Sequence, residues 1–179
     1  MRALLAVFVF AAVTIAPGQD PEAGPMMPPP KELKALYFMK GEWDADLKMF
    51  EPGKPPLPFK GTVKTGDALR GMWIETRHDS DMGGMPMQGL QMTSYDPGKK
   101  KYMAYWFDSV GPGGLELWGS LKGQTLVLTS DRVEIPGMPG KHAFRATTSL
   151  KGAGKLLFRL EMNSGKGWHP MIEGTMTKK

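Results

Sequence analysis

From Gly41 onward, apolar and polar residues alternate in short runs that glycine, proline or aspartate interrupts. A two-residue period places successive side chains on opposite faces of an extended chain, which is typical of strands with one buried face. The pattern predicts ten strands, over residues 43–50, 59–64, 72–78, 88–95, 101–109, 115–121, 125–133, 142–150, 155–162 and 168–177. Links such as Pro97-Gly98 and Lys122-Gly123 are short enough to join antiparallel neighbours.

The connections between these strands constrain how the sheet closes. No stretch between them has the length and period of a crossover helix, so they favour an antiparallel up-and-down sheet. A sheet of about ten strands removes its exposed edges by closing into a barrel, whose interior holds packed side chains or one small ligand. A short helix over residues 31–40 precedes the first strand, with Leu33, Leu36, Tyr37 and Lys40 at helical spacing. We therefore expect an all-β, antiparallel up-and-down barrel with a short N-terminal helix; a β-sandwich is the alternative.

The first residues have the composition of a secretory signal. Arg2 is followed by an apolar run from Ala3 to Ile15 that is too short to span a bilayer. We expect residues 1–18 to be a signal peptide cleaved after Gly18, residues 19–30 a proline-rich linker, and residues 31–179 a single domain. The leader predicts export to the periplasm or the extracellular space, without integral membrane association. The chain has no cysteine, so the domain folds without disulfides.

Charge and motifs narrow the function classes. Removing Arg2 with the leader lowers the formal charge from +5 to +4, and most of the basic residues are dispersed. With a leader in front, this modest excess does not predict a nucleic-acid partner. The sequence holds no cysteine nucleophile, Gly-x-Ser-x-Gly elbow, His-Glu-x-x-His helix or phosphate-binding loop. These patterns favour a binding function over an enzyme, and nothing in the sequence indicates an oligomeric state.

Polar and aromatic side chains on the predicted strands are candidates for a ligand pocket. A pocket of this kind has an apolar lining with a few fixed polar contacts, and it binds amphipathic small molecules. The candidate residues are Trp73, Glu75, Arg77, Tyr95, Trp106, Asp108, Arg145 and Glu173. The alternative is that the charged members pair with one another across neighbouring strands or face water.

The most unusual local composition lies in residues 78–87. Thioethers are soft ligands that suit Cu(I), so His78, Met82, Met85 and Met87 form a candidate metal site in an exported protein. Gly83, Gly84 and Pro86 are ordinary turn residues, and methionine also fills gaps in pockets and lids. We therefore expect residues 79–87 to form a flexible lid at the barrel mouth, with a Cu(I) site as the alternative.

The motif Gly41-Glu42-Trp43, between a short helix and the first strand, resembles the Gly-x-Trp opening of the lipocalins and fatty-acid-binding barrels. The resemblance implies that Trp43 plugs the closed end of the barrel and that a basic residue, Lys178 or Lys179, packs across it. In haem-binding barrels of the nitrobindin type, a histidine on a late strand is an axial haem ligand. Haem at His169 is thus a further alternative; apart from haem and Cu(I), the sequence predicts no cofactor.

Over a longer stretch, the sequence resembles the bacterial family called domain of unknown function 1579. The motifs that carry it extend over nearly the whole predicted domain: Gly41-Glu42-Trp43, Gly71-Met72-Trp73-Ile74, Met82-Gly83-Gly84-Met85-Pro86, Gly89, Ser94-Tyr95-Asp96, Lys100-Lys101-Tyr102, Trp106, Asp108 and Lys178-Lys179. This resemblance implies a calycin-like β-barrel, but it implies no reaction and no ligand.

These observations lead to one functional expectation. We expect an exported barrel that binds a small hydrophobic or amphipathic ligand. The alternatives are a periplasmic copper-binding protein that uses the methionine-rich segment, an enzyme, and a structural envelope protein with a packed barrel.

Overall fold

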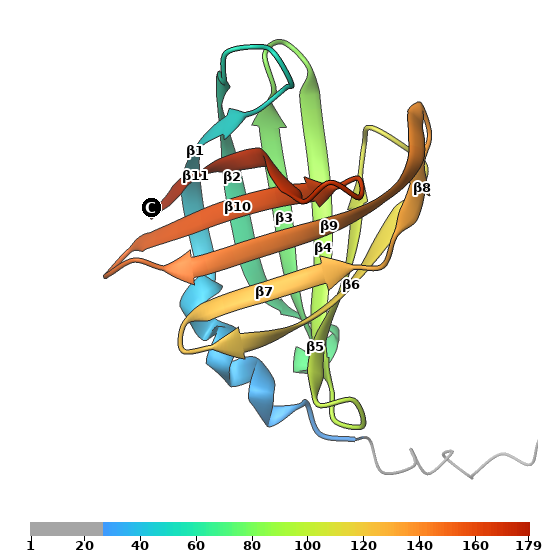
Figure 1. Ribbon diagram of the computed structural model, residues 1–179. Coiled ribbons are helices and arrows are strands. Elements are labelled where there is room, and N and C mark those ends of the chain that lie inside the picture. The colour runs from blue at the N-terminus through green and yellow to red at the C-terminus, as the bar shows by residue number, and fades with distance from the viewer. Residues whose placement is uncertain (1–26) are drawn as a thin grey trace, which may run out of the picture.

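In the computed structural model, which describes residues 27–179, the strands form one antiparallel sheet that closes on itself (Figure 1). The strands are β1 (Gly41–Met49), β2 (Leu57–Ala68), β3 (Trp73–Asp81), β4 (Pro86–Asp96), β5 (Lys101–Asp108), β6 (Gly114–Lys122), β7 (Thr125–Ser130), β8 (Val133–Ile135), β9 (Met138–Leu150), β10 (Lys155–Asn163) and β11 (Trp168–Lys178). Neighbours in the chain are mostly neighbours in the sheet, and pairing of β10 with β9 completes a ten-stranded barrel to which β8 is an appendage. The predicted up-and-down barrel is confirmed. The predicted signal peptide and most of the linker lie outside the described residues.

One predicted strand is divided in the structure. Residues 125–133 were expected to be continuous, but β7 ends at Ser130, and β8 forms a separate hairpin with the first half of β9. The hydroxyl of Ser130 donates a hydrogen bond to the carbonyl of Asp131 and accepts one from the backbone N–H of Phe144. This side chain replaces a backbone acceptor at the point where β7 stops pairing with β9, so the chain leaves the barrel wall there.

The closed end of the barrel is covered by η1, a 3₁₀ helix over Lys31–Met39. A 3₁₀ helix has three residues per turn, so Leu33, Leu36 and Met39 share one face, and all three are buried. Tyr37, which α-helical spacing would place on that face, is exposed. The helix is predicted correctly, but its tighter turn selects a different buried face. Within residues 27–179 there is no helix long and apolar enough to cross a membrane.

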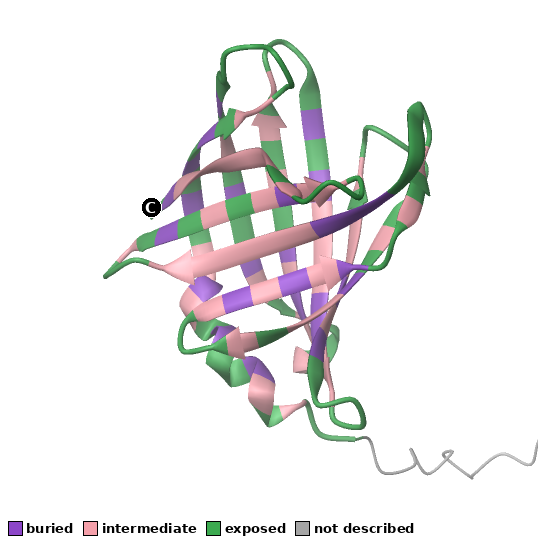
Figure 2. Cartoon of the chain, in the orientation of Figure 1, coloured by how far each residue is buried: buried purple, intermediate pink, exposed green. Residues whose placement is uncertain are grey.

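Trp43 occupies the position that the resemblance implies. Its side chain is 1% exposed, and its indole Nε1–H donates a hydrogen bond to the carbonyl of Met39 at 2.9 Å. The Nζ atom of Lys178 lies 5.7 Å from the centre of the indole ring. The alternation of buried and exposed residues along β1 begins at this tryptophan (Figure 2). Trp43 therefore joins the end of η1 to the first strand and closes the barrel.

Candidate functional site

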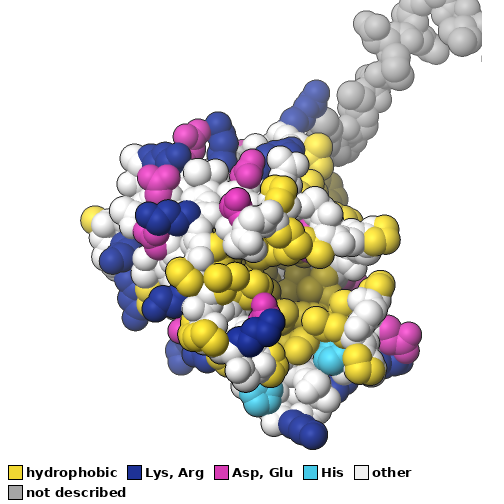
Figure 3. All heavy atoms as spheres, turned by 90° about the horizontal axis from the view of Figure 1, so that it is seen from above, with side chains coloured by type: hydrophobic (Ala, Val, Ile, Leu, Met, Phe, Trp, Pro, Cys, Tyr) yellow, Lys and Arg dark blue, Asp and Glu magenta, His cyan; other side chains and the backbone are white. Residues whose placement is uncertain are grey.

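The end of the barrel opposite η1 is open. Seen from this end, the molecule is hollowed at its centre, and most of the visible wall of the hollow is hydrophobic (Figure 3). The connections at this end comprise residues 50–56, 82–85, 109–113 and 164–167, together with the β8–β9 hairpin. An apolar concavity inside a rigid wall is where small ligands bind in barrels of this size. The interior is therefore the candidate site.

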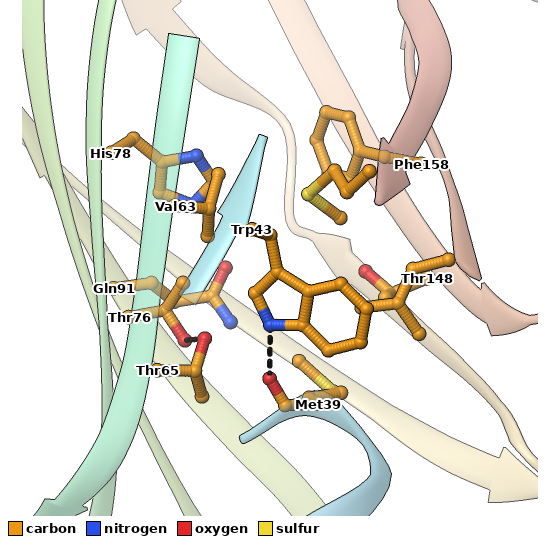
Figure 4. Close-up of a pocket in the computed structure, with 11 residues that line it drawn as sticks. Met39, Trp43, Val63, Thr65, Thr76, His78, Gln91, Thr148 and Phe158 are labelled. Atoms are coloured by element: carbon orange, nitrogen blue, oxygen red, sulfur yellow. Dashed lines mark hydrogen bonds between the residues drawn. The ribbon is translucent and has the colours of Figure 1, made fainter. Parts of the chain in front are cut away.

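A small cavity lies inside the barrel, next to the end of η1 (Figure 4). About 350 Å³ of atom-free space lies here, part of it open to solvent, but the centre of a water molecule has only about 20 Å³ in which to move. The lining residues come from η1 and from both sides of the barrel: Met39, Trp43, Val63, Thr65, Thr76, His78, Gln91, Thr148, Leu156, Phe158 and Met176. Space of this size admits one group about as large as a water molecule. We call it the inner chamber.

An aromatic layer borders the inner chamber on the side of the wider mouth, and the chamber stays partly open. His78 of β3 meets the ring of Trp106 edge-on, at 5.1 Å between centroids, and its centroid lies 6.5 Å from that of Phe158. Phe158 belongs to β10, which is not a neighbour of β3 in the sheet, so the three rings come from different parts of the barrel wall and face one another in the lumen. Gly89 makes room for this layer, because a Cβ atom there would lie 2.3 Å from Cη2 of Trp106. A glycine inside a strand is a known signal of such close approach.

The inner chamber contains polar groups but no charged ones. The hydroxyls of Thr65 and Thr76 lie 3.1 Å apart, and the amide nitrogen of Gln91 donates to Thr93 Oγ1 at 2.9 Å. Within residues 27–179, no hydrogen bond is made by the imidazole of His78, the hydroxyl of Thr148 or the amide oxygen of Gln91. These three groups face a cavity with unused hydrogen-bonding capacity.

His78 is held neutral by its surroundings. Its ring lies deep inside the barrel, and desolvation lowers the pKa of the imidazole from 6.5 to about 4. Part of the side chain nevertheless remains accessible, because it borders the cavity. At neutral pH the ring therefore offers one donor and one acceptor, and it carries no charge.

This burial predicts a pH-dependent stability. The imidazole pKa is about 4 in the folded state and 6.5 when the chain is unfolded, so between these values the unfolded state binds the proton more readily. The free energy of unfolding contributed by a neutral His78 is complete above pH 6.5 and decreases as the pH falls toward 4. We expect a loss of about 2 kcal/mol between pH 7.5 and pH 5, measured by urea unfolding. His78→Leu should lack this loss; an equal loss in both proteins would contradict the assignment.

The structure divides the predicted ligand-binding residues between the two faces of the wall. Tyr95, Trp106 and Asp108 are on the inward face, where Trp106 Nε1–H donates to a carboxylate oxygen of Asp108 at 2.8 Å. Tyr95 packs edge-on against Tyr102 next to η1, so it belongs to the closed end and not to the inner chamber. The remaining predicted residues do not face the barrel interior. They lie on its outer face: Trp73, Glu75, Arg77, Arg145 and Glu173.

The charged residues on the outer face pair with one another, as the alternative expectation held. Glu75 and Arg77 are joined at 2.6 Å on β3. Arg145 contacts Glu161 at 2.7 Å, and its guanidinium also lies 4.3 Å from the ring centre of Trp168. Glu173 is 3.9 Å from Arg159. The hydrogen bond from Arg145 is the main reason why the pKa of Glu161 is below its usual value.

Residues 79–87 do not form the expected loop. Strand β3 continues to Asp81 and β4 begins at Pro86, so only residues 82–85 form the turn. The backbone N–H of Met82 donates to the carbonyl of Met85 at 2.9 Å, and Gly84 N–H donates to a carboxylate oxygen of Asp81. The segment is therefore the tip of a hydrogen-bonded hairpin rather than a long lid.

The candidate metal ligands do not share one environment. His78 and Met87 are on the inward face, Met82 packs beside the apolar cluster around Trp43, and Met85 is exposed at the tip. In the described part of the chain, no cluster of three or more His, Asp or Glu side chains could hold a metal ion. His169, the candidate haem ligand, is exposed near the start of β11.

Sequence analysis missed Thr65, Thr76, Gln91 and Thr148 of the inner chamber and named His78 only as a candidate metal ligand. Thr76 and His78 alternate with Glu75 and Arg77 on β3, and only the position of the buried Ile74 shows which of the two sets faces inward. Gln91 and Thr148 lie in strands of mixed composition, where the two faces look alike in the sequence. The glycine at position 89 was a usable signal for the placement of Trp106.

Comparisons with known proteins agree with this architecture. The crystal structure of Rv2717c from M. tuberculosis is similar at a TM-score of 0.66, with 14% sequence identity over 85% of this chain and 99% of that chain. At this identity the likeness concerns the fold alone. No curated protein matches the chain significantly. A family model matches residues 28–178, so the chain belongs to the family described as Protein of unknown function (DUF1579).

Proposed function

We propose that this protein is an exported binding protein that holds one small hydrophobic or amphipathic molecule inside its barrel. The observation that carries the proposal is the open, apolar hollow above the aromatic layer of His78, Trp106 and Phe158 (Figure 3). Burying apolar surface of a ligand there contributes roughly 25 cal/mol per Å². The export part of the proposal rests on the Arg2 to Ile15 segment.

The distribution of side chains between the two faces supports a binding role. The closed end is filled, with Leu36, Ile74, Leu126 and Leu156 almost completely buried. Farther toward the mouth, inward-facing Leu160 and Met162 of β10 remain partly exposed. Unfilled apolar space lowers the stability of a protein. A barrel with a purely structural role would therefore be expected to bury its inward-facing residues at both ends.

The test places a larger side chain inside the hollow, on β10, and measures the effect on ligand binding. Leu160 is the next inward-facing residue after Phe158 on β10, two residues nearer the mouth. Leu157 on the same strand faces outward. We expect wild-type protein to bind the neutral fluorophore N-phenyl-1-naphthylamine with 1:1 stoichiometry. Leu160→Trp should weaken binding at least about tenfold, because the indole occupies the ligand's space, and Leu157→Trp should bind like the wild type. Absence of fluorophore binding, or equal binding by the two variants, would overturn the proposal.

A further inference from the structure

We propose that the inner chamber receives an uncharged hydroxyl or carbonyl head of the ligand, while the apolar part of the molecule extends toward the mouth. This inference rests on the proposed function and adds the chemical class of the ligand. It is carried by the cavity itself and by the unpaired polar groups of His78, Gln91 and Thr148 that face it (Figure 4).

The unpaired groups of the chamber complement a hydroxyl in particular. The neutral imidazole has a donor and an acceptor, the Gln91 amide oxygen is an acceptor, and the Thr148 hydroxyl can serve as either. They come from β3, β4 and β9, so they approach the chamber from opposite sides of the barrel. An alcohol both donates and accepts hydrogen bonds, so it can pair with groups that have no partner within residues 27–179.

The size of the chamber restricts the head group. The space of about 20 Å³ in which the centre of a water molecule can move accommodates one oxygen atom with its hydrogen. A phosphate, a sugar or a trimethylammonium group is several times larger. Most of the other lining residues are apolar: Met39, Trp43, Val63, Leu156, Phe158 and Met176. Of these, Phe158 lies on the side of the mouth, where the first carbons of the ligand would pass.

Charge argues against a fatty acid or another anion. The lining contains no lysine or arginine, because Arg77 and Arg145 are on the outer face, where each pairs with a glutamate. The charged side chain of Asp108 is on the inward face toward the mouth and is itself an anion. A carboxylate in the chamber would be buried without a cationic partner, which is much more costly than burying a hydrogen-bonded hydroxyl.

The first experiment compares ligands on the wild-type protein. Displacement of N-phenyl-1-naphthylamine is measured with 1-decanol and with decanoate at pH 8, which share a ten-carbon chain and differ in the head. We expect 1-decanol to bind at least about tenfold more tightly than decanoate, because only the alcohol avoids an unpaired buried charge. Equal or tighter binding of decanoate would overturn the inference, and this comparison requires no variant to fold.

The second experiment removes the chamber's hydrogen bonds one at a time. Thr148→Val and Gln91→Leu keep the approximate side-chain volume, and each should weaken 1-decanol about 3–10-fold, as expected for one lost hydrogen bond. Thr147→Val, on the outer face of the same strand, is the matched control and should have no effect.

The outcomes separate the inference from the proposed function. If 1-decanol still displaces the fluorophore but its affinity is unchanged by Thr148→Val and Gln91→Leu, the ligand binds in the hollow without using the chamber. In that case only the inference is wrong. If neither the fluorophore nor 1-decanol binds to the wild-type protein, the proposed function fails and the inference fails with it.

Discussion

Replacing Trp43 with alanine is expected to lower the free energy of unfolding by about 3–5 kcal/mol, the range for a large aromatic residue removed from a core. The indole is 1% exposed and lies among Ala45, Val63, Leu156 and Met176 at the closed end. Its removal leaves a cavity where η1 meets β1 and deprives the Met39 carbonyl of its hydrogen-bond donor. Chemical unfolding monitored by circular dichroism measures the change.

Trp118 provides the control for Trp43. It lies on the outer face of β6, where its Nε1–H donates to Glu116 and Lys99 Nζ lies 3.6 Å from its ring centre. Trp118→Ala removes the same side chain from a partly exposed position on the outer face, so the loss should stay below about 1 kcal/mol. Comparable losses in the two variants would mean that Trp43 does not close the barrel as described.

A single methyl group at position 119 should prevent the barrel from closing as it does now. A Cβ atom on Gly119 would lie 1.7 Å from the carbonyl oxygen of Val127 and 2.9 Å from Cα of Leu128. Both are backbone atoms of β7, so the clash cannot be relieved by turning a side chain; β6 and β7 would have to separate. We expect Gly119→Ala to cost at least about 3 kcal/mol or to abolish soluble folded protein.

Gly66 is the matched control for Gly119. It also lies inside a strand, but a Cβ atom there meets nothing within 4 Å. Gly66→Ala should therefore be neutral or raise stability by up to about 1 kcal/mol, because alanine restricts the unfolded chain. Both variants are compared by thermal and urea unfolding. Equal stability of the two variants would contradict the prediction, because it would mean that β6 and β7 can move apart at position 119 without loss of stability.

The protonation of His78 links stability to the site. The ring is kept neutral by the same enclosure that shields the inner chamber, so a change that opens the barrel should raise the pKa of His78 toward 6.5. The two largest stability effects lie elsewhere, at the closed end and in the β6–β7 wall. The protein can therefore retain unfilled space near its mouth while the opposite end provides most of the packing.

Most of the strands could be predicted because they depend on local information. The two-residue period and the glycine and proline links locate the ten strands of the barrel to within a few residues, and antiparallel pairing follows from the short connections. The plug at Trp43 and the basic residue across it, Lys178, came from the resemblance. The end of β7 was mispredicted because a single serine hydroxyl replaces a ladder hydrogen bond there, which no period reveals.

What the sequence by itself determined is the set of strands and their antiparallel order. Only the tertiary structure decided which face of each strand is the inside. On β3 the set Trp73, Glu75 and Arg77 and the set Ile74, Thr76 and His78 have the same period, and a shift of one residue in register would exchange them. The register is set by closure of the whole barrel and by the packing of Ile74 with η1. The inner chamber exists only in the folded barrel, because its lining comes from η1 and from strands far apart in the chain, from β1 to β11.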